Sequence, residues 1–253
     1  MEIEFAASAR SSPIDARLQT VAAAIASIAM PDWTLCDVGS DHASLLASLL
    51  RSETISFGIA VENKTQPRLN SLMALNGLHA EVRLGDGLDP ITTNECDGLS
   101  ICGMGGRSMI SILNRHPNRV PQWIFLQPNK DIEQVREWAF HTGFRLHDEA
   151  LTSKLFTILV YHNPRQFSAM ARGRSAIPMP ADSERLSPND PAYESIDLEA
   201  GFLFGPLLLK RRDARLFARL REEQVYLRNL THRTKRTQAR YDAICRLLNS
   251  SAS

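Results

Sequence analysis

The sequence predicts an α/β protein with a doubly wound, mostly parallel sheet. Three observations support this fold class. Short apolar runs of strand length alternate with helical periodicity over residues 33–141. Glycine-containing turns follow three of the first four runs, at the point where each strand would end. Two further strand-like runs then follow each other without an intervening helix, which predicts an antiparallel hairpin at the end of the sheet.

The predicted elements follow in order. A helix is expected over residues 10–30, because apolar side chains recur there at helical spacing and Pro31 follows them. Five strands are expected at residues 33–38, 55–61, 79–84, 97–102 and 123–126. Helices are expected at residues 41–51, 67–76, 107–114 and 131–141. The hairpin strands, at residues 144–151 and 155–161, complete the seven-stranded sheet of a Rossmann-like methyltransferase fold.

The first strand ends in Asp37-Val38-Gly39-Ser40-Asp41-His42, around which the rest of the site is expected to assemble. Gly39 would let a cofactor lie against bare backbone at the carboxyl end of the strand. A dinucleotide site needs the pattern G-x-G-x-x-G, and residues 39–44 lack its second and third glycines. Carboxylates at this place instead suit the amino and sulfonium groups of S-adenosylmethionine. Taken alone, the pattern is equally compatible with a plain Asp-Gly turn.

Features at three later strand ends strengthen the cofactor hypothesis. Glu62 ends the second strand about twenty residues after the first turn, where it could accept both ribose hydroxyls, although an ordinary surface carboxylate is an open alternative. Asp86, between two glycines, could accept from the exocyclic amine of adenine. The glycines of residues 103–106 would allow close approach of a substrate. Contacts to S-adenosylmethionine are expected from Asp37, Gly39, Ser40, His42, Glu62, Asp86, Gly87, Gly103 and Met104.

Composition excludes several classes of protein. The chain has 253 residues, of which 43% are hydrophobic, enough for a sizeable core. It begins with an acidic segment and contains no run long enough to span a bilayer. We therefore expect a cytoplasmic protein that does not bind a membrane. The four cysteines show no C-x-x-C spacing, which predicts reduced thiols and no metal site. We expect a monomer.

The net charge of +1 conceals an uneven distribution. Residues 207–246 contain twelve basic and four acidic residues, a net +8, so the rest of the chain carries −7. Such a segment suits a polyanionic partner, and a solvated helix face is the alternative. Residues 207–248 contain no Gly or Pro, which predicts one long helix or, as we favour, a helical hairpin. The predicted division is a methyltransferase domain at 1–163, a proline-rich linker at 164–200 and a basic, coiled-coil-like helical domain at 201–253.

Several motifs together resemble the bacterial tRNA (adenine-N1)-methyltransferase family TrmK, which modifies adenine 22 of tRNA. They occur in the order of that family and span nearly the whole chain: residues 16–22, Asp37 to Ala43, Gly85-Asp86-Gly87-Leu88, Gly103-Met104-Gly105-Gly106, Leu126-Gln127-Pro128-Asn129 and Gly205-Pro206. The chain departs from the family pattern at residues 44–46, where an aromatic residue, Leu and Pro are usual, and around Glu62. Phe156-Thr157 also replaces a common aromatic-Glu pair, and the proline-rich stretch is longer than usual.

The resemblance implies a tRNA methyltransferase that acts on ring nitrogen 1 of adenine. We expect catalytic roles for Asp41, Gln127 and Asn129. Asp41 is expected to line the same crevice, and the amides of Gln127 and Asn129 can recognise both the acceptor and the donor edge of a flipped-out adenine. Asp41 and His42, or Asn129, could instead cap a helix. RNA contacts are expected from Arg17, Arg211, Arg212 and Arg215. A methyltransferase acting on another RNA site or on a small molecule stays open, as does a non-catalytic binding module.

Overall fold

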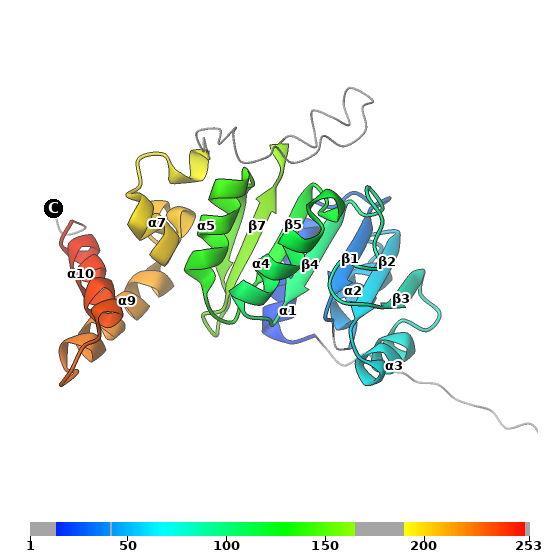
Figure 1. Ribbon diagram of the computed structural model, residues 1–253, viewed down its shortest axis with the longest axis horizontal. Helices are drawn as coiled ribbons and strands as arrows, with labels where there is room; N and C mark the ends of the chain where they lie inside the picture. The colour runs from blue at the N-terminus through cyan, green and yellow to red at the C-terminus, as the bar shows by residue number, and fades with distance from the viewer. Residues whose placement is uncertain (1–13, 41, 165–189, 251–253) are drawn as a thin grey trace, which may run out of the picture.

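The computed structural model describes residues 14–40, 42–164 and 190–250, and within them it contains the predicted seven-stranded sheet (Figure 1). The spatial order of the strands is β3-β2-β1-β4-β5-β7-β6. Five strands are parallel, and β7 pairs antiparallel with both β5 and β6. The strands are β1 (Thr34–Val38), β2 (Phe57–Glu62), β3 (Ala80–Leu84), β4 (Gly98–Cys102), β5 (Trp123–Gln127), β6 (Arg145–Leu151) and β7 (Thr157–His162).

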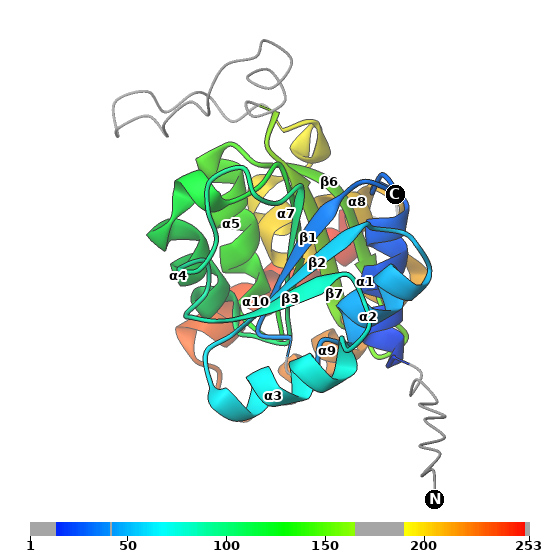
Figure 2. The ribbon, with the colours of Figure 1, turned by 90° about the vertical axis from the view of Figure 1, so that its right-hand side faces the viewer.

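Helices cover both faces of the sheet, as Figure 2 shows. They are α1 (Ala16–Ala26), α2 (Ser44–Arg51), α3 (Thr65–Ala74), α4 (Gly106–Arg115) and α5 (Ile132–Thr142), with a short 3-10 helix, η1 (Pro117–Arg119). Alternate side chains of β1 enter two separate cores: Leu35 packs with α1 and α2, whereas Cys36 and Val38 pack with α4 and α5. The central strands are therefore apolar along almost their whole length, as expected for strands that are buried on both faces.

Helix ends follow from local capping. The helix predicted over residues 10–30 begins at Ala16, because the carboxylate of Asp15 accepts from the amide of Leu18 at 2.8 Å. The helix predicted from residue 41 begins at Ser44, after Ala43 in a left-handed conformation. The other predicted helices and strands of the sheet domain agree with the structure to within three residues at each end.

The C-terminal segment forms a helical hairpin that lies at the opposite end of the molecule from β3 (Figure 1). It contains η2 (Pro191–Tyr193), α7 (Leu198–Phe204), α8 (Pro206–Lys210), α9 (Ala214–Arg228) and α10 (Lys235–Ser250). Buried Leu220 and Leu227 of α9 pack with Ile244 of α10 in a third apolar cluster. The hairpin that the sequence favours over a single helix is thereby confirmed.

Part of the segment expected to be a linker packs on the sheet. Asp190 accepts from the amide of Leu146 at 2.9 Å, which ties the segment to β6. Tyr193 is buried against Phe140 of α5, with ring centroids 4.9 Å apart. Residues 190–200 thus differ from a free linker, because their apolar side chains complete the core over α5. Residues 165–189 lie outside the described part of the chain.

A buried ion pair joins the C-terminal helices to the sheet. Arg136 on α5 donates to Glu149 on β6 at 2.8 Å, and both side chains are almost fully buried. The other oxygen of Glu149 accepts from the amides of Leu207 and Leu208 at 2.8 and 3.1 Å. Gly205 has φ +99°, and a Cβ there would lie 2.6 Å from the Glu149 carboxylate. The Gly205-Pro206 motif therefore lets the backbone reach this ion pair.

Candidate functional site

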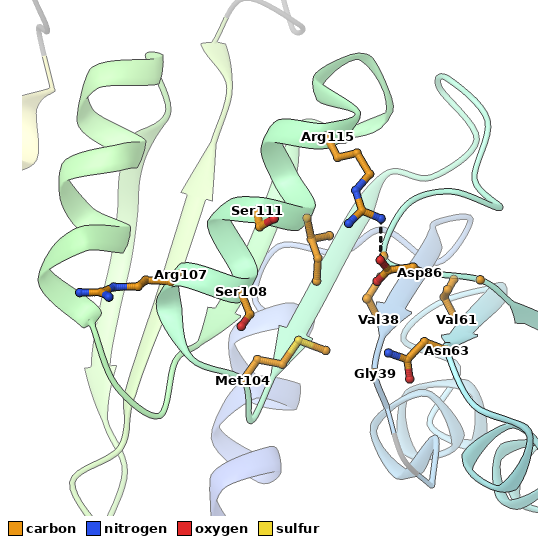
Figure 3. A pocket seen from close by; sticks show the side chains of 13 residues that line it. Val38, Gly39, Val61, Asn63, Asp86, Met104, Arg107, Ser108, Ser111 and Arg115 are labelled. Carbon is orange, nitrogen blue, oxygen red and sulfur yellow. Dashed lines mark hydrogen bonds and ion pairs between the residues drawn. The ribbon is translucent and has the colours of Figure 1, made fainter.

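Two cavities open beside the carboxyl ends of the parallel strands, where the order of the sheet reverses between β1 and β4. We call the first the α4 cavity: it measures about 480 Å³ and is lined by α4 and by the ends of β1, β2 and β3 (Figure 3). The second, the α1 cavity, measures about 430 Å³ and lies beside Arg17 and Leu18 of α1. Gly39 lines both cavities.

Gly39 is required by its backbone and by its surroundings. Its φ is +70°, and its amide donates to the carbonyl of Val61 at 2.8 Å, which fixes the turn against β2. A Cβ at this position would lie 2.2 Å from the methyl group of Met104, which lines the α4 cavity. A residue with a side chain would therefore strain this turn and collide with Met104, whose methyl group lies against the Gly39 backbone between the residues that line the two cavities.

Glu62 is a buried carboxylate at the end of β2, only 3% exposed. Its Oε1 accepts from the hydroxyls of Ser40 and Ser71, at 2.6 and 3.0 Å. The surface-carboxylate alternative is wrong, because two hydroxyl donors hold this side chain inside the protein. Sequence reasoning does not identify Ser71 as a site residue, because only the packing of α3 on β2 brings it to Glu62.

Asp37 is likewise 3% exposed and faces the α1 cavity. Burial raises the pKa of its carboxyl to about 7, and the nearby charge of Glu62 acts in the same direction. A hydrogen bond from Ser100 at 2.7 Å and the positive charge of Arg17 oppose this rise. Sequence reasoning also misses Ser100, although it is a polar residue in an otherwise apolar strand run and pairs in register with Asp37.

Asp86 lies at the rim of the α4 cavity and is half-exposed. Arg115, from the last turn of α4, donates to its Oδ2 at 2.6 Å, as Figure 3 shows. Gly87 follows with φ +61°, so the chain turns sharply after the carboxylate. The sequence could not identify Arg115 as a site residue, since its approach to Asp86 depends on the packing of α4 over the β3–β4 connection.

A polar network connects α1 with the β4 and β5 loops. Gln127 is fully buried, and its Oε1 accepts from Arg17 at 2.5 Å and from the amide of Gly103 at 3.1 Å. Its Nε2 donates to Asn129 at 3.1 Å, and Asn129 in turn donates to the carbonyl of Gly103 at 2.6 Å. Gly103 has φ +79°, where a side chain would be strained.

The two predicted amides therefore differ in position. Asn129 lines the α1 cavity, whereas Gln127 lines neither cavity and instead orients its neighbours. Asn129 is not the cap of α5, because Asp131 occupies that position. His42 lies one residue before Ala43, which holds the N-cap position of α2, and His42 lines neither cavity. Asp41 lies outside the described residues.

The predicted RNA-binding arginines occupy two places rather than one surface. Arg17 lines the α1 cavity. Arg211 pairs with Asp148 of β6 at 2.7 Å, and Arg215 donates to the carbonyl of Leu151 at 2.6 Å. Arg212 lies over the ring of Phe217 at 5.9 Å. Arg211 and Arg215 thus help to dock α8 and α9 on β6, whereas the contact of Arg212 lies within the C-terminal segment. Farther along the hairpin, the exposed cations of the described residues are Arg219, Arg221, Arg228, Lys235, Arg236 and Arg246.

Metal-binding clusters and membrane-spanning helices are both absent from the described residues. No group of three or more His, Cys, Asp or Glu side chains in this part of the chain could hold a metal ion. No helix there has the length and apolar character needed to cross a membrane.

Comparisons with known proteins agree on a family. A model described as "Methyltransferase domain" matches residues 14–159. The tRNA (adenine(22)-N(1))-methyltransferase of Bacillus subtilis (strain 168) is 32% identical over 237 residues, which cover 90% of this chain and 84% of that protein.

Solved structures show the same arrangement over nearly the whole chain. The crystal structure of the B. subtilis m1A22 tRNA methyltransferase TrmK superposes with a TM-score of 0.72 at 27% identity, covering 94% of this chain and 97% of the other. A structure of Streptococcus pneumoniae Sp1610 in complex with S-adenosyl-L-methionine gives a TM-score of 0.71 at 24% identity over 93% and 99% of the two chains. The latter likeness concerns the fold alone.

Proposed function

Because this chain belongs to the family of tRNA (adenine(22)-N(1))-methyltransferases, we propose that it transfers the methyl group of S-adenosylmethionine to ring nitrogen 1 of adenine 22 in tRNA. The observation that carries the proposal is the crevice at the ends of β1, β2 and β4. There Gly39 and the buried Asp37 line the cavities, and the buried Glu62 accepts from Ser40, which lines the α1 cavity. The chain is similar to the B. subtilis enzyme over 90% of its length.

The residues of the crevice fit S-adenosylmethionine. Glu62 uses Oε1 for the two serines, and its Oε2 accepts no hydrogen bond from the described residues, so this oxygen can accept from ribose hydroxyls. Asp86 and the bare backbone of Gly87 border the α4 cavity, where an adenine would lie. Asp37 can pair with the amino group of the methionine portion. The bound cofactor supplies an electrophilic methyl group on its sulfonium.

The chemistry needs little from acid or base groups. Nitrogen 1 of adenine is unprotonated at neutral pH, so its lone pair is available without a strong general base. The chain's residues therefore act mainly by positioning, which can account for several kcal/mol of the barrier. Asn129 can contact the base through its remaining donor and acceptor sites, and Gln127 keeps this amide oriented. The methylated ring is cationic, so carboxylate or carbonyl dipoles close to it would stabilise it.

The helical hairpin is proposed as the main tRNA-binding part. Residues 207–246 carry a net +8, whereas the remainder of the chain is acidic and would repel a polyanion. A small-molecule methyltransferase would give these helices no such role, and the similarity to a tRNA-modifying enzyme covers 90% of this chain. We also propose that the enzyme acts as a monomer in the cytoplasm and without a metal.

The test uses the purified full chain, labelled S-adenosylmethionine and an unmodified tRNA transcript that carries adenine at position 22. Methyl incorporation, followed by nuclease digestion and mapping of 1-methyladenosine, should place the product at that position. A transcript with guanine 22 serves as the matched control and should accept no methyl group. Incorporation into both transcripts would contradict the site, and incorporation into neither would contradict the function.

A further inference from the structure

The α1 cavity contains a single aromatic residue among its described lining residues, Phe156, which follows the β6–β7 turn. Its ring is half-buried and faces a cavity whose other walls include Arg17, Asn129 and Asp37. We propose that Phe156 is the surface on which the target adenine stacks during methyl transfer. This inference rests on the proposed function and adds to it a residue that determines how the base is held.

The division of the two cavities supports this assignment. Asp86, Val61 and Asn63, at the ends of β2 and β3, all line the α4 cavity, and none of them lines the α1 cavity. The adenosine portion of the cofactor therefore fits the α4 cavity, where Asp86 can accept from the exocyclic amine of adenine. The α1 cavity is left for the reacting end of the cofactor and for the base that receives the methyl group.

The chemistry of the α1 cavity suits a flipped-out base. Enzymes that modify a base usually hold it by stacking on an aromatic or apolar side chain and by hydrogen bonds to its edge. Phe156 can supply the stacking face, and Asn129 can supply the hydrogen bonds. The exposed part of this half-buried ring gains from being covered, because stacking removes its apolar surface from water.

The backbone of the turn that carries Phe156 is held by hydrogen bonds within the turn and from α9. The amide of Phe156 donates to Thr152 Oγ1 at 3.0 Å, and the amide of Thr152 donates to the carbonyl of Phe156 at 2.9 Å. Arg215 and Arg219 of α9 donate to the carbonyls of Leu151 and Leu155, at 2.6 and 3.4 Å. The proposed stacking residue therefore lies on a turn that the basic hairpin itself contacts, so a tRNA bound there approaches this cavity.

The experiment compares Phe156→Ala, Phe156→Leu and Phe156→Trp in the full chain. Stacking on one aromatic ring typically changes the interaction on the order of ten- to a hundredfold. We expect Phe156→Ala to lower kcat/KM for tRNA by about that factor, Phe156→Leu to lower it nearly as much, and Phe156→Trp to retain most of it. The matched control is Phe57→Leu. Phe57 is the first residue of β2, at the end of that strand away from Glu62, so this change should leave the rate unchanged.

Affinity for S-adenosylmethionine, measured by calorimetry, should stay within about twofold of the wild-type value in all four variants, because Phe156 stacks on the target adenine and not on the cofactor. Equal rates for Phe156→Leu and the wild type would overturn the stacking proposal, as would a loss of cofactor affinity that parallels the loss of rate. If Phe156→Ala fails to fold, the order of the Trp and Leu variants decides. Failure of the wild type to methylate any tRNA would instead contradict the proposed function, so the two outcomes remain distinct.

Discussion

Two buried carboxylates, Asp37 and Glu62, lie close together at the ends of adjacent strands and are satisfied differently. Glu62 accepts from two hydroxyls, whereas Asp37 accepts from the hydroxyl of Ser100. Burial raises the pKa of Asp37 to about 7, and Glu62 adds to that rise. The two residues thus suit different tasks: Glu62 can accept from neutral hydroxyls, and Asp37 can respond to a cationic group.

The contribution of Glu62 can be measured directly. Loss of a charge-assisted contact to ribose hydroxyls costs about 1.5–3 kcal/mol, or roughly ten- to a hundredfold in affinity. We expect Glu62→Ala to weaken S-adenosylmethionine binding by this factor in a calorimetric titration. The control is Glu53→Ala, an exposed carboxylate after α2, which should bind normally. Unchanged affinity in a folded Glu62→Ala protein would remove this residue from the site.

Asp37 should make cofactor binding depend on pH. Its pKa in the folded protein, about 7, lies well above the ordinary value of 3.8, so the carboxyl is largely protonated at about pH 6. A cationic ligand favours the ionised form, and binding below about pH 7 must therefore release a proton. We expect affinity to rise with pH up to about 7, by at most roughly tenfold per pH unit, and then to level off.

Calorimetry in buffers with different heats of ionisation measures the protons released. Asp37→Asn should bind more weakly and should lose this release of protons in the range just below about pH 7. Proton release that persists in this variant would assign the release to another group.

The raised pKa of Asp37 also affects the stability of the folded protein. Because the folded pKa is raised, the folded state binds more protons than the unfolded state, and stability falls as pH rises from about 4 to 7.

At the scale of the elements, Arg215 has a structural role, because it joins α9 to β6. Arg215 donates to the backbone of β6, although its side chain is 51% exposed. We expect Arg215→Ala to lower the free energy of unfolding by about 1–2 kcal/mol. The control, Arg221→Ala, removes an exposed cation from the same helix and should change it by less than about 0.5 kcal/mol. Urea denaturation of both variants makes the comparison.

Periodicity is sufficient to predict the elements of the sheet domain, because the central strands are buried on both faces and the helices between them have one apolar side. The turns of the site are predictable for a related reason, since the carboxyl ends of parallel strands meet at one edge. Ser71, Arg115 and Phe156 are not identifiable in this way, because their positions depend on how distant elements pack. Gln127 is predicted to touch the base, yet it lies inside the sheet as the last residue of β5.

At the scale of the whole molecule, the absence of a metal requirement is a further prediction. Attack by a free lone pair on a sulfonium methyl group needs no Lewis acid. The enzyme is first treated exhaustively with a chelator. It is then assayed with refolded tRNA and a fixed level of magnesium, which the RNA needs for its structure, and its turnover should be unchanged. Calcium in place of magnesium is the matched control, because it also supports RNA structure. Activity with magnesium and none with calcium would contradict the prediction.

Truncation is a poor test of whether the helical hairpin binds tRNA while the sheet domain binds the cofactor. A chain cut after Asn163 would lose the helices that contact Arg136 and Glu149, and a buried ion pair left without its backbone partners is expected to destabilise the fold. Cofactor affinity in such a fragment would then report folding rather than RNA binding. Substitution of exposed cations avoids this difficulty.

We therefore expect the combined variant Arg221→Gln, Arg228→Gln and Lys235→Gln to weaken tRNA binding while cofactor affinity stays unchanged. Each cation that no longer neutralises a phosphate lowers the slope of log K against log salt by roughly 0.7–0.9, so the slope should fall by up to about three units. Arg51→Gln, which removes a cation at the end of α2, should leave the slope as it is. The position of the methylated adenine should not change, because cations that contact phosphates carry no sequence information. If the triple variant bound tRNA with the wild-type slope, these cations would belong to a solvated helix face, and the RNA would have to be held by another surface.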